Sequence, residues 1–194
     1  DISQEYTEPL KDEEVRPIII EALAGGIDTT ANVFSFSIYY LAHYPSIKDR
    51  LLQEIDDFYN QNQNRSLTYD DLPNLIYCEA VIKEVSRVMT TAPFLSRYST
   101  EPDVIGNIQW DADTHYLIFT PGIHLNENYW EEPKEFNVDR FISIDEQQQQ
   151  QSGKNNLIMW GGGLRQCPGR KLAMLELKCF LVSMFRNWDV ELLD

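Results

Sequence analysis

The ten residues from Trp160 to Gly169 constrain this chain most, because they place three successive glycines, Gly161 to Gly163, shortly before Cys167. Glycine reaches backbone angles that other residues avoid, so this run predicts a tight loop whose main chain can lie against something flat. The residues that follow, Lys171 to Val182, have helical composition and an apolar stripe, and the Pro-Gly pair before them suits a first turn. Cys167 is therefore expected at a helix N-terminus.

A helix N-terminus and the nearby Arg165 and Arg170 favour a thiolate over a thiol at Cys167. A nucleophilic cysteine needs a base, and no local cysteine-protease signature surrounds any of the three histidines, His43, His115 and His124. Zinc needs further ligands, and no CxxC or HxxxH pair occurs. One thiolate on a glycine-rich loop fits a metal whose other ligands come from a cofactor, of which haem is the obvious case. Taken alone, the stretch equally fits a buried free cysteine beside a glycine turn.

A long helix is predicted from about Lys11 to Tyr44, with an acidic N-terminal end and an interior too apolar for the surface. Gly25 and Gly26 in its middle cost about 2 kcal/mol relative to alanine, and the threonines that follow can bond back to the preceding turn. A kink or bulge is expected there. Taken alone, the glycine pair is better explained as a place where another helix approaches closely, with Asp28 capped locally.

Two more helices are predicted before a region of short strands. The first covers Ser46 to Tyr59, with Ser46 as its N-cap, and the second ends near Met89. In the second, Glu84 and Arg87 are three apart and share a face, which alone indicates an ordinary surface ion pair. Turns and short strands follow from Thr91 to Thr120, and the segment 116–119 is the best strand.

Composition excludes several classes of function. The 16 basic and 31 acidic residues give a net charge of −15, which argues against nucleic acid as a partner. Three scattered cysteines do not form a disulfide framework. The chain has no signal-peptide pattern and no apolar run of roughly 18 residues, so this segment is not expected to anchor itself in a membrane and is soluble in character.

Four stretches, read together, resemble the cytochrome P450 family. The family's haem-binding signature, Phe-x-x-Gly-x-Arg-x-Cys-x-Gly, is matched except that Trp160 replaces phenylalanine, and its oxygen-activation motif is matched from Gly25 to Thr30. The family's Glu-x-x-Arg helix is matched at Glu84 and Arg87. Its Pro-x-x-Phe-x-Pro-x-Arg-Phe segment is matched from Pro133 to Phe141, with Val138 replacing a proline.

This resemblance implies a mostly α fold with a small β region: a long central helix, the Glu-x-x-Arg helix, and a cysteine loop followed by a helix. It implies haem b, iron protoporphyrin IX, with Cys167 as the axial ligand of the iron. The expected cofactor-binding residues are Trp160, Gly163, Gly169 and Cys167, with Arg97 and Arg165 on the propionates. Glu84, Arg87 and Arg140 are expected to form a buried structural lock. His124 is expected to make only a structural hydrogen bond.

The implied activity is monooxygenation of a small apolar substrate, with electrons from an NADPH-dependent P450 reductase. Thr29 would supply a hydroxyl beside the oxygen, and Asp28 would bring protons from solvent. The expected substrate-lining residues are Leu23, Ala24, Pro93, Phe94 and Leu95. A basic cluster near the cysteine fits either a docking face for the reductase or a solvated helix face, and consists of Arg165, Arg170, Lys171 and Lys178.

The resemblance covers residues 1–194 as a partial cytochrome P450 domain, with the N-terminal half and the extreme C-terminus missing. The missing part includes the membrane anchor of eukaryotic members, which would place a full-length protein on the cytosolic face of the endoplasmic reticulum membrane. The isolated chain is therefore expected not to be a competent enzyme. Two alternatives stay open: a catalytically inactive haem-binding fragment or remnant, and a haem-thiolate isomerase or dehydratase that needs no reductase. The glutamine run 147–151 is expected to be a flexible insertion.

Overall fold

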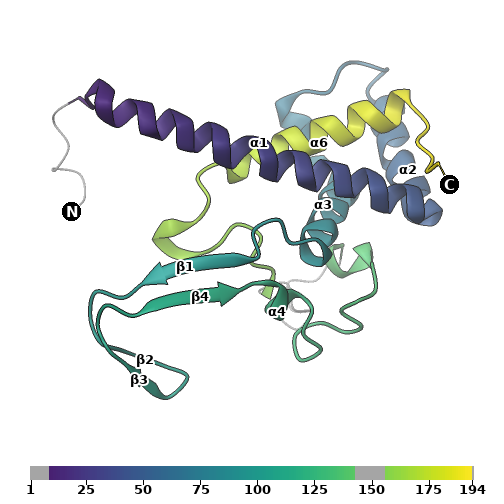
Figure 1. Cartoon of the computed structure of the whole chain (residues 1–194). Helices are drawn as coiled ribbons and strands as arrows, with labels where there is room; N and C mark the ends of the chain where they lie inside the picture. The colour runs from purple at the N-terminus through teal and green to yellow at the C-terminus, as the bar shows by residue number, and fades with distance from the viewer. Residues whose placement is uncertain (1–8, 143–155, 194) are drawn as a thin grey trace.

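The computed structural model describes residues 9–142 and 156–193, and it is mostly helical with two small sheets (Figure 1). The predicted fold class is confirmed. The predicted glutamine insertion lies outside the described residues. The principal helices are α1 (Asp12–His43), α2 (Pro45–Gln61), α3 (Ile76–Val88) and α6 (Arg170–Asn187), and the shorter ones are η2 (Tyr69–Asn74), α4 (Pro121–His124), η3 (Val138–Phe141) and η5 (Gly163–Arg165).

The strands form two antiparallel pairs that follow one another along the chain. β1 (Phe94–Tyr98) pairs with β4 (His115–Phe119), and the predicted strand 116–119 lies inside β4. β2 (Asp103–Ile105) pairs with β3 (Ile108–Trp110). Gly106 and Asn107 join these two strands with φ values of 61° and 64°. A two-residue hairpin with both central residues in the left-handed region is the turn that glycine and asparagine favour.

α3 occupies the centre of the helical core, where α1, α2 and α6 pack around it. Its residues Val81, Ile82 and Val85 are fully buried, as the helical spacing of its apolar residues requires. Ile76, in contrast, is 59% exposed. It is the first residue of the helix, and its side chain faces outward between the buried Leu75 and Tyr77.

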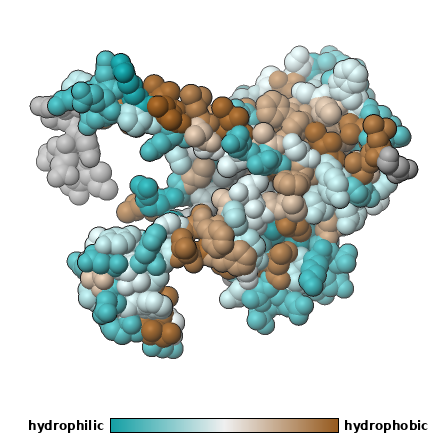
Figure 2. Space-filling model, viewed as in Figure 1, coloured by the Kyte–Doolittle hydropathy of each residue, from teal (hydrophilic) through white to brown (hydrophobic). Residues whose placement is uncertain are grey.

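α1 is buried only in its C-terminal half, on one face whose residues recur every three or four positions: Thr30, Val33, Ser37 and Leu41. The N-terminal half extends beyond the helical core (Figures 1 and 2), and its large apolar side chains are exposed, among them Ile18 (52%), Ile20 (65%), Leu23 (57%) and Ile27 (61%). The prediction that this helix is too apolar for the surface is therefore wrong for its first half. In the part of the chain that the structure describes, no element covers that half.

The predicted kink or bulge in α1 is also absent, because every residue from Asp12 to His43 is α-helical. A Cβ on Gly25 or Gly26 would meet nothing within 4 Å, so no neighbouring group enters the hydrogen-bond ladder to open it. The Thr29 hydroxyl does bond back as expected, donating to the Gly25 carbonyl oxygen at 2.6 Å.

The start of α2 differs from its prediction as well. The helix begins at Pro45, with Tyr44 in the N-cap position and no side-chain cap, so Ser46 is not the N-cap. Proline suits a first helical position because its missing N–H has no partner to lose there. None of the helices that the structure describes combines the length and the apolar character needed to cross a bilayer.

Candidate functional site

The cysteine loop, residues 156–169, closes on itself just before α6. The Cys167 N–H donates to the Trp160 carbonyl oxygen at 2.9 Å. Gly161 and Gly163 have φ values of 71° and 66°, a left-handed conformation that disfavours other residues. α6 begins at Arg170, so Cys167 lies within three residues of a helix N-terminus, as its sequence context predicts.

The loop leaves open space beside its main chain. Cys167 is exposed, and a Cβ on Gly162 or Gly163 would meet nothing within 4 Å. A Cβ on Gly169 would lie 3.9 Å from the Cys167 Sγ. The glycines therefore present bare backbone next to an accessible thiol, and a flat group can approach both.

Two arginines lie at this loop without carboxylate partners among the described residues. Arg97 comes from β1, and its Nη2 donates to the Gly162 carbonyl oxygen at 3.4 Å while its Nη1 donates to that of Ser96 at 2.8 Å. Arg165 is exposed within the loop itself. Guanidinium groups bind carboxylates strongly, so this pair can hold an acidic ligand beside Cys167.

The three cysteines differ in accessibility. Burial raises the pKa of the Cys78 and Cys179 thiols, which keeps both protonated. Cys167 is the exposed one. Within residues 9–142 and 156–193, no group of three His, Cys, Asp or Glu side chains can hold a metal ion. The residues present therefore fit a cofactor that brings most of its own metal ligands and carries carboxylates, as haem does.

The remaining predicted site residues come from α1 and β1. Asp28 and Thr29 lie on the exposed half of α1 with Leu23 and Ala24, whereas Pro93 and Leu95 flank Phe94 at the start of β1, where Phe94 is 58% exposed. In Figure 1 the loop before α6 lies between these two elements, and Figure 2 shows a notch that separates them. The structure thus places the two groups on different elements, of which β1 contacts the cysteine loop through Arg97.

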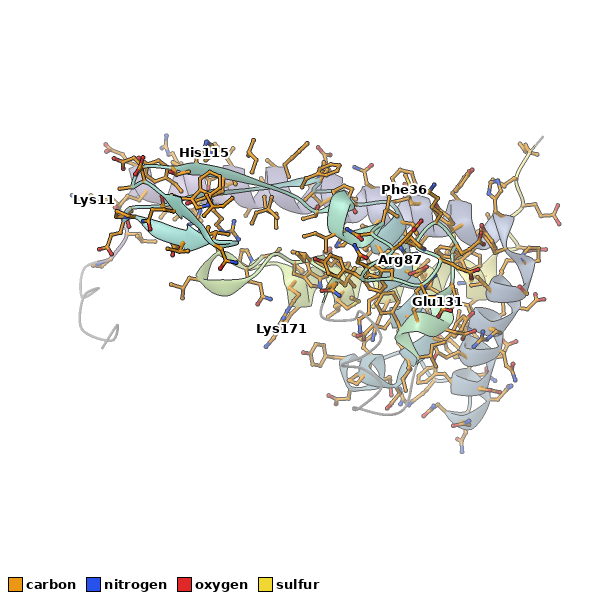
Figure 3. All side chains as sticks on the ribbon, turned by 90° about the horizontal axis from the view of Figure 1, so that it is seen from below. Lys11, Phe36, Arg87, His115, Glu131 and Lys171 are labelled. Carbon is orange, nitrogen blue, oxygen red and sulfur yellow. The ribbon has the colours of Figure 1, made fainter. Side chains whose placement is uncertain are left out.

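Glu84 and Arg87 form a fully buried ion pair, which excludes the surface pair that the spacing alone suggested. Arg87 Nε and Nη2 donate to the two carboxylate oxygens of Glu84, both at 2.7 Å, and both side chains have 0% exposure. Figure 3 shows Arg87 in the interior. Arg140 Nε lies 3.6 Å from Glu84 Oε1, a distance that permits charge attraction but no hydrogen bond. The three side chains predicted to form a lock therefore lie together.

Arg87 also donates to main-chain oxygens that no side-chain pattern reveals. Its Nη1 reaches the carbonyls of His124 at 2.9 Å and Pro133 at 2.6 Å, and its Nη2 reaches that of Glu135 at 3.0 Å. Its guanidinium carbon lies 5.2 Å from the centre of the Trp130 ring. One buried arginine therefore holds the segment between β4 and η3 against α3.

Lys178 does not belong to the exposed basic cluster that was predicted near the cysteine. Lys178 is 3% exposed, and its Nζ donates to Glu79 Oε2 at 2.6 Å and to the Leu72 carbonyl oxygen at 2.8 Å. It cannot belong to a docking face. Lys178 lies four residues before the buried Val182 and therefore on the apolar side of α6, so its spacing could have predicted its burial. Arg170 and Lys171 are exposed, and Lys171 extends away from the molecule in Figure 3.

Comparison with known proteins places the chain in a haem-protein family. The family model described as Cytochrome P450 matches residues 2–194. The chain therefore belongs to the cytochrome P450 family. It is 31% identical to the steroid 17-alpha-hydroxylase/17,20 lyase of Macaca fascicularis, over 97% of this chain and 37% of that protein, and 28% identical to cytochrome P450 4V2 of Mus musculus, over 98% and 35%.

Among solved structures, the heme domain of cytochrome P450DA has a TM-score of 0.82 at 24% identity, over 94% of this chain and 39% of that one. That likeness shows the shared fold. The chain spans between 35% and 37% of the length of the curated relatives named above.

Proposed function

We propose that the protein is a haem-thiolate monooxygenase that acts on a small apolar substrate. The observation that carries this proposal is the cysteine loop, where an exposed Cys167 adjoins bare glycine backbone and two guanidinium groups lack carboxylate partners among the described residues. In the proposal, Cys167 ligates the iron of haem b, Arg97 and Arg165 bind the two propionates, and Trp160 packs on the thiolate side.

When bound, the haem supplies oxygen activation and the transfer of one oxygen atom to the substrate, with electrons from a reductase. The protein's part begins with the thiolate. Cys167 lies within three residues of the N-terminus of α6, whose first residue is Arg170. The bond from the Cys167 N–H to the Trp160 carbonyl fixes the backbone that carries it.

In the proposal, Asp28 and Thr29 transfer protons from solvent to the site. The exposed Asp28 carboxylate can exchange protons with solvent, and the neighbouring Thr29 hydroxyl can pass one on. In the structure that hydroxyl donates to the Gly25 carbonyl oxygen, so it must rotate away from this bond to act. The expected substrate contacts are the apolar residues of the same two elements, Leu23, Ala24, Pro93, Phe94 and Leu95.

The same proposal extends to partners and location. An NADPH-dependent reductase would supply electrons, and the exposed Arg170 and Lys171 beside the cysteine loop offer it positive charge. The chain would be the C-terminal, haem-binding part of a longer protein on the cytosolic face of the endoplasmic reticulum membrane. Glu84, Arg87 and Arg140 would act as a structural lock with no part in the chemistry.

The test is the spectrum of the reduced carbon-monoxide complex. The haem-loaded protein should show the Soret band of thiolate ligation, and Cys167→Ala should abolish it. Cys179→Ala is the matched control, because it removes a cysteine from the helix that follows the loop, α6, and should leave the band intact. Retention of the band by Cys167→Ala would rule out this ligand assignment. In a longer polypeptide that contains this chain, turnover that needs NADPH would exclude the reductase-independent isomerase or dehydratase, and the absence of any turnover would favour the inactive remnant.

A further inference from the structure

His124, the last residue of α4, uses both ring nitrogens although it is fully buried. Its Nδ1 lies 2.9 Å from the Thr90 hydroxyl, just beyond the C-terminus of α3. The Ile158 backbone N–H donates to its Nε2, also at 2.9 Å. The ring therefore bridges the end of α3 and the beginning of the cysteine loop.

These partners fix the protonation state of the ring. Because Nε2 accepts a hydrogen bond, the proton lies on Nδ1 and is donated to the Thr90 oxygen. Burial, together with the positive charge of Arg87, lowers the pKa of His124 to about 4, which agrees with a neutral ring. The charged groups next to it are Arg87 and the Glu84 paired with that arginine.

The backbone of the same residue reaches the buried ion pair. Its carbonyl oxygen accepts from Arg87 Nη1 at 2.9 Å. On the other side, Ile158 lies two residues before Trp160, whose carbonyl accepts the Cys167 N–H. A continuous series of short contacts thus runs from the Glu84–Arg87 pair through His124 to the backbone of the cysteine.

Within the described residues, only one other side chain from outside the cysteine loop hydrogen-bonds to it. That side chain is Arg97, whose 3.4 Å bond to the Gly162 carbonyl is longer. We propose that His124 is a positioning residue for the haem-thiolate site, holding the cysteine loop against α3 through the bond from the Ile158 N–H to its Nε2. This inference rests on the proposed function, since it concerns where Cys167 is presented to the haem.

Two substitutions separate this role from simple packing. In His124→Gln, the amide oxygen can occupy the position of Nε2 and still accept from Ile158. In His124→Asn, the shorter amide can reach Thr90 but not Ile158. Thr90→Val is a third variant, which removes the other ring partner and leaves the loop contact in place.

Two readouts on the haem-loaded protein test the proposal: hydrogen exchange at the Ile158 amide, and the fraction of the reduced carbon-monoxide complex with thiolate ligation. His124→Asn should speed exchange by roughly fivefold to tenfold and lower the thiolate fraction. His124→Gln and Thr90→Val should resemble the wild type in both readouts. Equal losses in the Gln and Asn variants, or no loss in Asn, would overturn the proposal.

The proposal also requires slow hydrogen exchange at the Ile158 amide in the unsubstituted protein. Fast exchange there would overturn the proposed bond to His124 even if the His124→Asn variant failed to fold. Failure of the proposed function has a different signature. The wild type could take up haem without a thiolate band while the variants still show the expected differences in hydrogen exchange at Ile158. In that case the haem-thiolate assignment is wrong, and the contact between His124 and the cysteine loop is still supported.

Discussion

Arg87 carries a charge with no exposure to water, a placement that costs several kcal/mol unless the charge is paired and hydrogen-bonded. It meets this requirement through two bonds to Glu84 and three to backbone carbonyls. Glu84 in turn accepts the Asn137 N–H at 2.8 Å. The pair is therefore well satisfied as it stands, and removing Glu84 would leave the buried Arg87 charge without a carboxylate partner.

At the same scale, the neutral ring of His124 predicts a dependence of stability on pH. Its folded-state pKa is about 4, below the ordinary value of 6.5, so in mild acid the unfolded chain binds the proton first. Its contribution to stability is complete above pH 6.5 and is lost as pH falls toward 4, by about 3 kcal/mol. Urea unfolding at several pH values should show a shallower acid loss in His124→Gln. Parallel curves for the two proteins would contradict the prediction.

Among the elements, α6 has two roles, one in the core and one beside the candidate site. Its inner side packs Leu177, Leu181 and Phe185 into the core, and its N-terminal end lies beside the cysteine loop. Lys178 belongs to the inner side, where it joins α6 to the Leu72 carbonyl of η2 and to Glu79 of α3. The helix that presents the candidate site is thus held by a partly buried ion pair as well as by apolar packing.

Lys178→Met should lower the free energy of unfolding by about 1–3 kcal/mol, because it leaves the Leu72 carbonyl without its donor. The loss is limited because Glu79 keeps its second partner, Lys83, at 2.7 Å. Lys171→Met on the same helix is the control and should change stability by no more than about 0.5 kcal/mol, since that side chain is exposed. Urea denaturation measures both, and equal effects would show that the buried contact contributes nothing.

The sequence predicted elements well where one face of a helix is apolar and the ends carry local signals. The bounds of α1 and the buried face of α3 follow from such spacing. Prediction from the sequence failed where a residue's hydrogen-bond partner lies far away in the chain. Glu54 of α2 accepts the N–H groups of Tyr77 and Cys78 at 2.6 and 2.8 Å, a cap for α3 from 23 and 24 positions away that no local pattern reveals.

The candidate site was predictable from motifs to a similar extent. Cys167 and the glycines are found together because the family pattern fixes their order within one short loop, and Arg97 reaches that loop from β1. The structural hydrogen bond predicted for His124 is confirmed, but its partner in the cysteine loop was not predicted, since Ile158 lies 34 residues away and contributes only a backbone N–H. The absent bulge at Gly25 could not be predicted either, because two glycines permit an opening and do not by themselves impose one.

For the molecule as a whole, the exposed apolar half of α1 supports the proposal that a longer polypeptide exists. Side chains such as Ile20 and Leu23 are more than half exposed, whereas large apolar surfaces in proteins are generally covered by other structure. The chain also spans little more than a third of its curated relatives. In the proposal, further parts of the same polypeptide cover this half of α1.

Immunoblotting of native cell fractions should therefore detect a protein much heavier than 22.6 kDa that pellets with membranes. An antibody against the segment 60–70 suits this purpose, because most of that segment is exposed. A band near the calculated mass in the supernatant would contradict the proposal and would favour a truncated product.

The contacts of Arg87 bear on how freely this sequence can diverge. Three of its partners are the carbonyl oxygens of His124, Pro133 and Glu135, which every amino acid possesses. Mutations that replace the side chains of the last two positions would leave those acceptors in place, provided that the backbone keeps its course. The segment between β4 and η3 can thus accumulate substitutions over generations while keeping its attachment to α3, whereas Arg87 itself has no such latitude.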